Sequence, residues 1–266
     1  MLREANLRDA EATNRHLDTV RRALENLLEE SIELRFGGSV IKHTYVDGIS
    51  DVDLLAVVSR DTAVDANPQQ LIADFATAIR DRLPNTEVEI GQMSVKVRFE
   101  DGTELQILPA FKVGDGYRIP RQRGDSWSGV VRPRDFASRL TAVNENKSGK
   151  VVPIIKLFKI AQDRLPENSR LTGYHVEAIA VKAFQDYRGS LDRSEMLLHL
   201  ARIAGQTTIR PLEETTGQST YVDGYLGPEG STDRLRTSAA IQRLATKLEK
   251  ATERNQLEPW LEVFSE

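Results

Sequence analysis

The chain has 266 residues, 40 acidic and 36 basic side chains, a formal net charge of -4 and no cysteine. Without cysteine it can form no disulfide, thiolate zinc site or iron–sulfur cluster, so any metal must have oxygen or imidazole ligands. Its longest apolar runs, 54–58 and 151–155, are far shorter than the ~20 residues that cross a bilayer. The first residues carry scattered charges and no apolar stretch, which predicts a cytoplasmic protein without a secretory signal.

The first half of the chain alternates between helical and strand patterns. Apolar residues at spacings of three and four indicate helices, and Val-rich or alternating runs beside turn residues indicate strands. The predicted elements are a helix over about 3–30, a strand over 51–58, a helix over 68–83 and a hairpin formed by 94–99 and 104–108. The Asp101-Gly102 pair is typical of a tight hairpin turn.

The second half is predicted to be helical throughout. The expected helices are roughly 134–144, 152–165, 172–188, 193–204, 232–254 and 258–264. A Gly-, Pro- and Thr-rich connection, 205–230, separates two of them, and a loop of this length is usually functional or mobile. The fold class is therefore α+β, with an α/β lobe over 1–135 and an all-helical lobe over 136–266.

Two carboxylates stand at the start of the strand 51–58. In a strand, residues i and i+2 point to the same face, so Asp51 and Asp53 are expected to lie together. Neighbouring carboxylates repel each other unless a proton or cation lies between them, and a hard divalent cation such as Mg²⁺ is the usual solution. The pair therefore predicts a metal site.

A glycine-rich turn precedes the acidic pair by eleven residues. Ser39 is expected to cap a short helix beginning near Val40, whose free N–H groups would face an anion. Gly37 and Gly38 would let a phosphate approach closely. A phosphate site beside a carboxylate pair is the arrangement that phosphoryl or nucleotidyl transfer requires.

The turn and the acidic pair resemble the signature of the DNA-polymerase-β-like nucleotidyltransferase superfamily. That superfamily needs a third carboxylate from a neighbouring strand, and in many relatives it lies three residues before a proline, where this chain has Gln106. Glu104 shares the face of Gln106 in the predicted hairpin. Either Glu104 has taken over the role or the site has only two acidic ligands, and we favour Glu104 because its long side chain shares the face.

Further motifs make the chain similar to the bacterial cyclic GMP–AMP-synthase-like nucleotidyltransferases. These CD-NTases, or SMODS-type oligonucleotide cyclases, serve anti-phage signalling. The motifs are GGSVIKHT at 37–44, SDVD at 50–53, QILPA at 106–110, PIIKLFK at 153–159, LTGYHVE at 171–177 and YVDGYLG at 221–227. The resemblance extends over nearly the whole chain.

This resemblance implies a two-lobed enzyme with its active site in the cleft, nucleoside triphosphates as substrates and Mg²⁺ as cofactor, with Mn²⁺ as an alternative. Asp51 and Asp53 would hold the metal that bridges the triphosphate, and Glu104 with Asp53 would hold the second metal. Gly38 and Ser39 would bind the leaving triphosphate. The product would be a cyclic di- or oligonucleotide that acts on a downstream effector, and an activating partner is expected.

Basic residues concentrate between 112 and 164, a segment that contains twelve Lys or Arg and only five Asp or Glu. A local positive charge in an acidic protein suggests a polyanionic ligand, although a solvated basic surface is the simpler explanation. The lysines expected to bind nucleotide are Lys42, Lys150, Lys156 and Lys159, and Lys147 is a further candidate. Tyr221, and less so Tyr225, could stack on a base or pack in the core. His43 and His175 are expected to be structural.

Two other functions remain open at this point. The same acids would serve a nucleotidyltransferase that modifies an antibiotic, a transfer RNA or a protein. Gln106, in the place of an acid, also favours a nucleotide-binding sensor that has lost turnover. In contrast to animal relatives, a chain without cysteine cannot form the cysteine-bound zinc element that senses DNA.

Overall fold

The computed structural model describes residues 10–46, 49–50, 52–121, 125–213, 222–254 and 257–264. The chain divides into two compact units. The sheet unit takes in the described residues of 10–41 and 50–134, and the helical unit takes in those of 42–49 and 135–264. The described residues of 42–49, which the sequence division assigns to the first lobe, therefore belong by their contacts to the helical unit.

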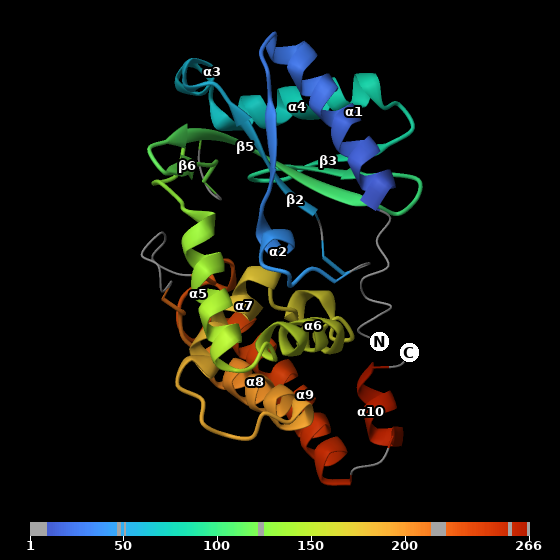
Figure 1. The fold of residues 1–266 in the computed structure, drawn as a ribbon, viewed down its shortest axis with the longest axis vertical. Helices are drawn as coiled ribbons and strands as arrows, with labels where there is room; N and C mark the ends of the chain where they lie inside the picture. Colours follow the sequence, from blue (N-terminus) through green and yellow to red (C-terminus); the bar gives the residue numbers. More distant parts are fainter. Residues whose placement is uncertain are drawn as a thin grey trace. The chain divides into compact units, whose positions relative to one another are not determined.

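The sheet unit has a mixed sheet with strand order β1-β2-β5-β4-β3, and β6 pairs with β5 (Figure 1). Its elements are α1 (Ala10–Leu28), β1 (Glu33–Phe36), α2 (Gly38–Ile41), β2 (Val52–Val58), α3 (Arg60–Asp65), α4 (Pro68–Arg82), β3 (Glu87–Ile90), β4 (Val95–Arg98), β5 (Glu104–Val113) and β6 (Gly116–Arg118). Strands β2 and β5 pair in parallel, and the other pairs are antiparallel.

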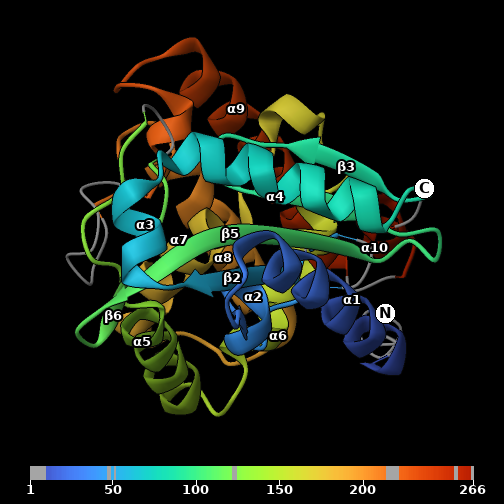
Figure 2. The same ribbon diagram turned by 90° about the horizontal axis from the view of Figure 1, so that it is seen from above.

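Helices α1 and α4 lie side by side over one face of the sheet (Figure 2). Helix α4 begins where the Asn67 side chain accepts the N–H groups of residues 69 and 70 and Pro68 occupies the first turn. The strand side chains under these helices are apolar and fully buried: Val52, Leu54, Val95, Val97, Leu105 and Ile107. The opposite face of the same strands carries the polar side chains.

The strand 51–58, the helix 68–83 and the hairpin are confirmed as β2, α4 and β4–β5. Their ends agree within two residues, except that β5 continues to Val113. The sequence patterns did not indicate β1, β3, β6 or α3. Each of these elements has only three to six residues, which is too short to show a hydrophobic period.

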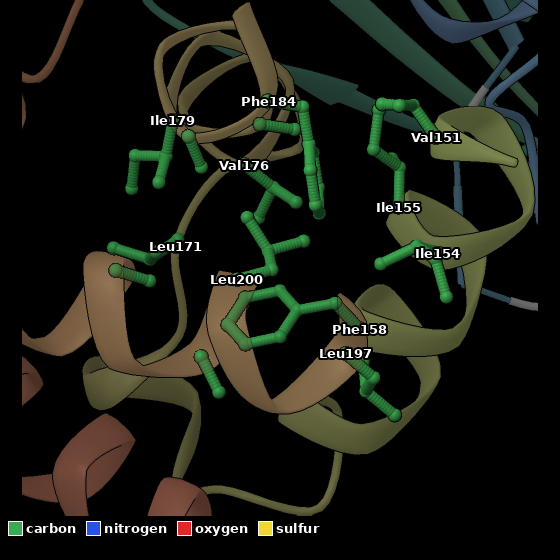
Figure 3. Close-up of a cluster of buried hydrophobic side chains, with 14 of the residues drawn as sticks. Val151, Ile154, Ile155, Phe158, Leu171, Val176, Ile179, Phe184, Leu197 and Leu200 are labelled. Atoms are coloured by element: carbon green, nitrogen blue, oxygen red, sulfur yellow. The ribbon is translucent and has the colours of Figure 1, made fainter. Parts of the chain in front are cut away.

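Within its described residues, the helical unit contains the six predicted helices and two short 3₁₀ turns. These are α5 (Pro133–Asn146), α6 (Val151–Gln162), η2 (Glu167–Ser169), α7 (Gly173–Gln185), α8 (Arg193–Thr207), η3 (Gly224–Leu226), α9 (Thr232–Arg254) and α10 (Leu257–Phe264). Figure 3 shows Phe158 of α6, Val176 of α7 and Leu200 of α8 pointing toward one another in its core. No helix within the described residues has the length and apolar character that a bilayer span requires.

Each unit contains one of the two tryptophans. In the sheet unit, Trp127 Nε1 donates to the Ala63 carbonyl oxygen at 3.0 Å. Its ring meets Phe111 edge-on, with centroids 4.9 Å apart. In the helical unit, Trp260 of α10 is partly buried and stacks on Phe264.

Candidate functional site

The side chain of Asp53 lies on the polar face of the sheet. The register pairs Asp53 of β2 with Gln106 of β5, and Gln106 with Lys96 of β4. Directly paired residues point to the same face, so the three side chains form one row across three strands. Val52 and Leu54 are buried on the other face, as the alternation predicts. Asp51 lies outside the described residues.

The glycine-rich turn is fastened to Asp53. The Gly37 N–H donates to the Asp53 carbonyl oxygen at 2.8 Å, and the Ser39 N–H donates to Asp53 Oδ2 at 3.3 Å. Gly38 has φ 48°, and a Cβ built there would lie 1.5 Å from Asp53 Oδ2. Only glycine fits a position with both that backbone and that contact. The two halves of the predicted motif therefore meet in space.

One detail of the predicted turn is wrong. Helix α2 begins at Gly38, so Ser39 is inside it and buried, and does not cap a helix that begins at Val40. The left-handed backbone of Gly38 turns the chain one residue earlier than the capping pattern indicated. The Ser39 N–H is directed at the Asp53 carboxylate as a result.

The two candidates for the third position differ in their surroundings. The carboxylate of Glu104 accepts from Arg98 Nε and lies 3.5 Å from Lys96 Nζ. Gln106 Nε2 donates to Ser94 Oγ at 3.1 Å, and it is Gln106 that the register places opposite Asp53. Glu104 is thus an acid held by two cations, and Gln106 is the neutral neighbour of Asp53. The choice between them stays a prediction.

The oxygen atoms of these side chains are of the type that binds a hard divalent cation. The carboxylates of Asp53 and Glu104 and the amide oxygen of Gln106 are oxygen ligands, which Mg²⁺ and Mn²⁺ prefer. A cluster of three or more His, Asp or Glu side chains suited to a metal does not occur among the described residues, which do not include Asp51. Glu104 could join a metal only by exchanging its contacts with Arg98 and Lys96.

Lys42 and Lys159 share one carboxylate inside the helical unit. Lys42 Nζ pairs with Glu177 Oε2, and Lys159 Nζ lies 3.0 Å from Glu177 Oε1. All three side chains are at most 7% exposed. Burial acts to raise the pKa of Glu177, but the two ammonium groups outweigh it and lower that pKa below its usual value. Lys42 also lies 5.2 Å from the ring centroids of Phe136 and Tyr174.

The remaining lysines of the basic stretch have separate surroundings. Lys147 Nζ donates to the Tyr187 carbonyl oxygen at 2.6 Å, and Lys150 Nζ to that of Leu191 at 2.8 Å. Both therefore fasten the α7–α8 connection. Lys156 is partly buried, and burial together with the charge of Lys159 lowers its pKa. Nucleotide binding by these lysines stays a prediction.

The aromatic candidates give a different outcome. Tyr221 lies outside the described residues. The Tyr225 hydroxyl accepts the Thr172 N–H at 3.1 Å and lies 3.0 Å from His175 Nδ1, and burial raises the pKa of Tyr225 to about 12. Tyr225 and His175 are thus packed structural residues. This agrees with the expected structural role of His175 and with the core-packing alternative for Tyr225. His43 is exposed, and its structural role stays a prediction.

Sequence reasoning missed a buried ion pair next to these residues. Arg234 Nη1 donates to Asp223 Oδ2 at 2.7 Å, and the same guanidinium reaches the carbonyl oxygens of residues 208, 210, 223 and 227. Asp223 accepts the Leu212 N–H. No sequence signal separates these two charges from those on the surface, because their burial depends on contacts between distant segments.

Comparison with known proteins identifies the family of the chain. Residues 1–144, more than half of the chain, match the family described as Second Messenger Oligonucleotide or Dinucleotide Synthetase domain, or SMODS. A relative from Acinetobacter, named cyclic AMP-AMP-AMP synthase, is 25% identical over 160 residues. That match takes in 58% of this chain and 45% of the relative, so the chain spans less than half of that protein.

Two solved structures show the same fold. Vibrio cholerae DncV cyclic AMP-GMP synthase, in complex with the linear intermediate 5′ pppA(3′,5′)pG, has a TM-score of 0.76 at 11% identity, covering 99% of this chain and 92% of that one. Escherichia coli MS115-1 CdnC, in a complex with HORMA-deltaN, has a TM-score of 0.62 at 18% identity, covering 98% and 93%. With the acidic strand and the glycine turn joined as described, the chain belongs to the SMODS family of second-messenger oligonucleotide or dinucleotide synthetases.

Proposed function

We propose that this protein is a metal-dependent nucleotidyltransferase that joins nucleoside triphosphates, ATP among them, into a cyclic di- or oligonucleotide for anti-phage signalling. The observation that carries the proposal is the fastening of the Gly37–Ser39 turn to Asp53. It brings a glycine turn that a phosphate can approach next to an acid that can hold a cation. Membership of a synthetase family supports the same activity.

The side chains of the sheet unit divide the work as follows. Gly38 and Ser39 bind the triphosphate, and the missing side chain of Gly38 lets the Asp53 carboxylate lie against the turn. Asp51, Asp53 and Glu104 would hold Mg²⁺ or Mn²⁺. When bound, such a cation would neutralise charge on the triphosphate and favour deprotonation of the attacking ribose hydroxyl. Asp53 keeps its position because the Ser39 N–H donates to its carboxylate.

The lysines of the helical unit supply positive charge for a triphosphate. Lys42 and Lys159 share the single carboxylate of Glu177, so the pair has more positive than negative charge. A buried excess of positive charge favours an anion nearby. Lys156 adds to this charge, and the lowered pKa that burial and Lys159 cause would return toward normal beside a phosphate. Lys150 and Tyr221 are the further nucleotide contacts of the proposal.

An activating partner and a downstream effector complete the proposal. One relative of the same fold, Escherichia coli MS115-1 CdnC, is described in a complex with HORMA-deltaN. A protein partner of comparable kind would switch on this chain, and the effector would act through the cyclic product. The chain without cysteine has no zinc-based route to DNA sensing.

A catalytically weak nucleotide sensor is the second candidate. It is favoured by Gln106, which stands opposite Asp53, and by the two cations that hold Glu104. In that case the protein would bind triphosphate and turn it over slowly or not at all. A transferase that modifies a separate acceptor would use the same acids and is distinguished by its product.

The test is incubation of the purified protein with radiolabelled triphosphates and Mg²⁺ or Mn²⁺, followed by phosphatase treatment and mass identification. A phosphatase-resistant cyclic product supports the first function. Label on an added acceptor would favour the acceptor-modifying transferase, and tight binding without turnover would favour the sensor.

The residue assignment is tested in the same assay with Asp53→Asn. We expect the rate of product formation to fall at least about 10³-fold, because the carboxylate that fastens the turn and holds the cation loses its charge. The matched control is Asp61→Asn, an exposed aspartate of α3 in the same unit, which should leave the rate unchanged. Equal rates for the two variants would remove Asp53 from the site.

A further inference from the structure

The segment 42–46, which follows α2 in the chain, is anchored by buried polar contacts. Thr44 is fully buried, and its hydroxyl donates to Glu177 Oε1 of α7. The Lys42 side chain is 7% exposed, and its ammonium group pairs with the other oxygen of the same carboxylate. Polar side chains are costly to bury unless they are paired, so these contacts fix the place of the segment in the helical unit.

Helix α6 contributes to the same anchor. Lys159 Nζ donates to Glu177 Oε1 at 3.0 Å and to the Thr44 carbonyl oxygen at 3.1 Å. Glu177 of α7 thus joins three groups from two other parts of the chain: Lys42 and Thr44 of the segment 42–46, and Lys159 of α6. Removing its charge would leave two buried ammonium groups without their shared counter-charge.

The backbone between the anchored residues is strained. His43 has φ 58°, in the left-handed region that residues other than glycine seldom adopt. Such a conformation persists where the surroundings impose it. The two neighbours of His43, Lys42 and Thr44, are the residues whose side chains end on Glu177. The anchor therefore imposes the shape of the chain at this point.

The anchored segment is covalently continuous with the glycine turn. Ile41 is the last residue of α2, and Lys42 follows it directly. The other end of α2 holds Gly38 and Ser39 against Asp53. We propose that Glu177 is a positioning residue for nucleotide binding: it fixes the segment 42–46, and thereby the path along which the chain leaves the triphosphate-binding turn. This inference rests on the proposed function.

The anchor itself is tested without nucleotide, by hydrogen–deuterium exchange of the full chain. Glu177→Gln should make the amides of 42–46 exchange about tenfold faster or more. Thr44→Val keeps both ion pairs and loses only the hydroxyl, so it should act in the same direction with a smaller effect and serves if Glu177→Gln does not fold. The control is Leu248→Ala, which removes buried apolar volume from α9 and should leave exchange of 42–46 unchanged.

The consequence for nucleotide binding is measured by calorimetry with Mg²⁺ and an ATP analogue whose α–β bridge is a methylene group. In Glu177→Gln the Kd should rise about tenfold, because the loss of the anchor outweighs the positive charge that the variant adds. Leu248→Ala, compared at a temperature where both are folded, should match the unaltered protein. Thr44→Val should again lie between them.

The outcomes separate the two proposals. Faster exchange of 42–46 with unchanged Kd would overturn the positioning role and leave the proposed function standing. Unchanged exchange in both Glu177→Gln and Thr44→Val would overturn the anchor. If the unaltered protein fails to bind the analogue, the proposed function is overturned as well. Failure of a variant alone leaves the proposed function standing.

Discussion

An ion pair of the sheet unit and an ion pair of the helical unit differ sharply in burial. In the sheet unit, Glu104 and Arg98 form a pair across β4 and β5 whose side chains are 23% and 50% exposed. In the helical unit, the side chains of Asp223 and Arg234 are 0% and 1% exposed. Exposed pairs contribute little and exchange partners readily, whereas a buried pair is costly to break. Glu104 of the sheet unit can therefore exchange its partners for a ligand, whereas Asp223 of the helical unit maintains the fold.

The strongest way to break this contrast is Arg234→Met. It leaves Asp223 buried without its partner and removes the donors to four carbonyl groups, so the free energy of unfolding should fall by about 3–5 kcal/mol. Urea denaturation followed by circular dichroism measures it. The control is Arg202→Met, which removes an exposed pair with Glu249 in the same unit and should cost less than about 1 kcal/mol. Similar losses in both variants would contradict the contrast.

The next effect is a pH dependence of stability carried by His175. Burial lowers its pKa to about 4 from the usual 6.5; Asp223 acts to raise it and Arg234 to lower it further. A folded-state pKa below the unfolded one gives stability that is present above pH 6.5 and is lost as the pH falls toward 4. The loss attributable to this residue should be roughly 3 kcal/mol.

The measurement is the free energy of unfolding of the unaltered protein and of His175→Asn between pH 7 and 4. The difference in the free energy of unfolding should shrink as the pH falls. The reason is that the unaltered protein takes up one more proton on unfolding than His175→Asn does. A constant difference across this range would show that His175 does not titrate as its burial requires.

A third comparison decides between the two candidates for the third ligand. If Glu104 leaves its cations and holds the metal, Glu104→Gln should lower the rate of product formation about 100-fold, and Gln106→Ala by less than about tenfold. Mn²⁺ affinity, measured by calorimetry on the free protein, should weaken only in Glu104→Gln. If Gln106→Ala is the more damaging variant in both assays, Glu104 is not the third ligand.

The smallest expected effect concerns the exposed ion pair of the sheet unit. Arg98→Met removes cross-strand pairs with Glu104 and Glu87, yet its side chain is half exposed, so the free energy of unfolding should change far less than in Arg234→Met. Urea denaturation at low and high salt measures it, and the small loss should diminish further in high salt. A loss as large as that of Arg234→Met would contradict this account of the sheet unit.

Much of this fold could be predicted from local patterns. The helices of the second half repeat apolar residues over three or more turns, and β2 and the β4–β5 hairpin show the strand period beside turn residues. The joining of the Gly37–Ser39 turn to Asp53 was also within reach, because it depends on a motif only seventeen residues long. Strands of three or four residues, such as β6, lack a measurable period.

The surroundings of the lysines could not be predicted in the same way. From the sequence, Lys42 and Lys159 could face solvent or a phosphate. Their burial depends on pairing with Glu177, which lies 135 positions from Lys42 and 18 positions from Lys159 in the chain. The burial of Asp223 with Arg234 is equally invisible locally. Charged residues reveal their neighbours only through tertiary structure, because the same residue types serve at the surface and in the core.

The tryptophan in each unit gives the molecule two optical reporters. Trp127 is tied to the Ala63 carbonyl group in the sheet unit, and Trp260 stacks on Phe264 in the helical unit. Replacing either by phenylalanine leaves a fluorescence signal from a single, known unit. The melting of the two halves can then be followed one at a time, and a nucleotide that quenches only one of the indoles would reveal which half it reaches first.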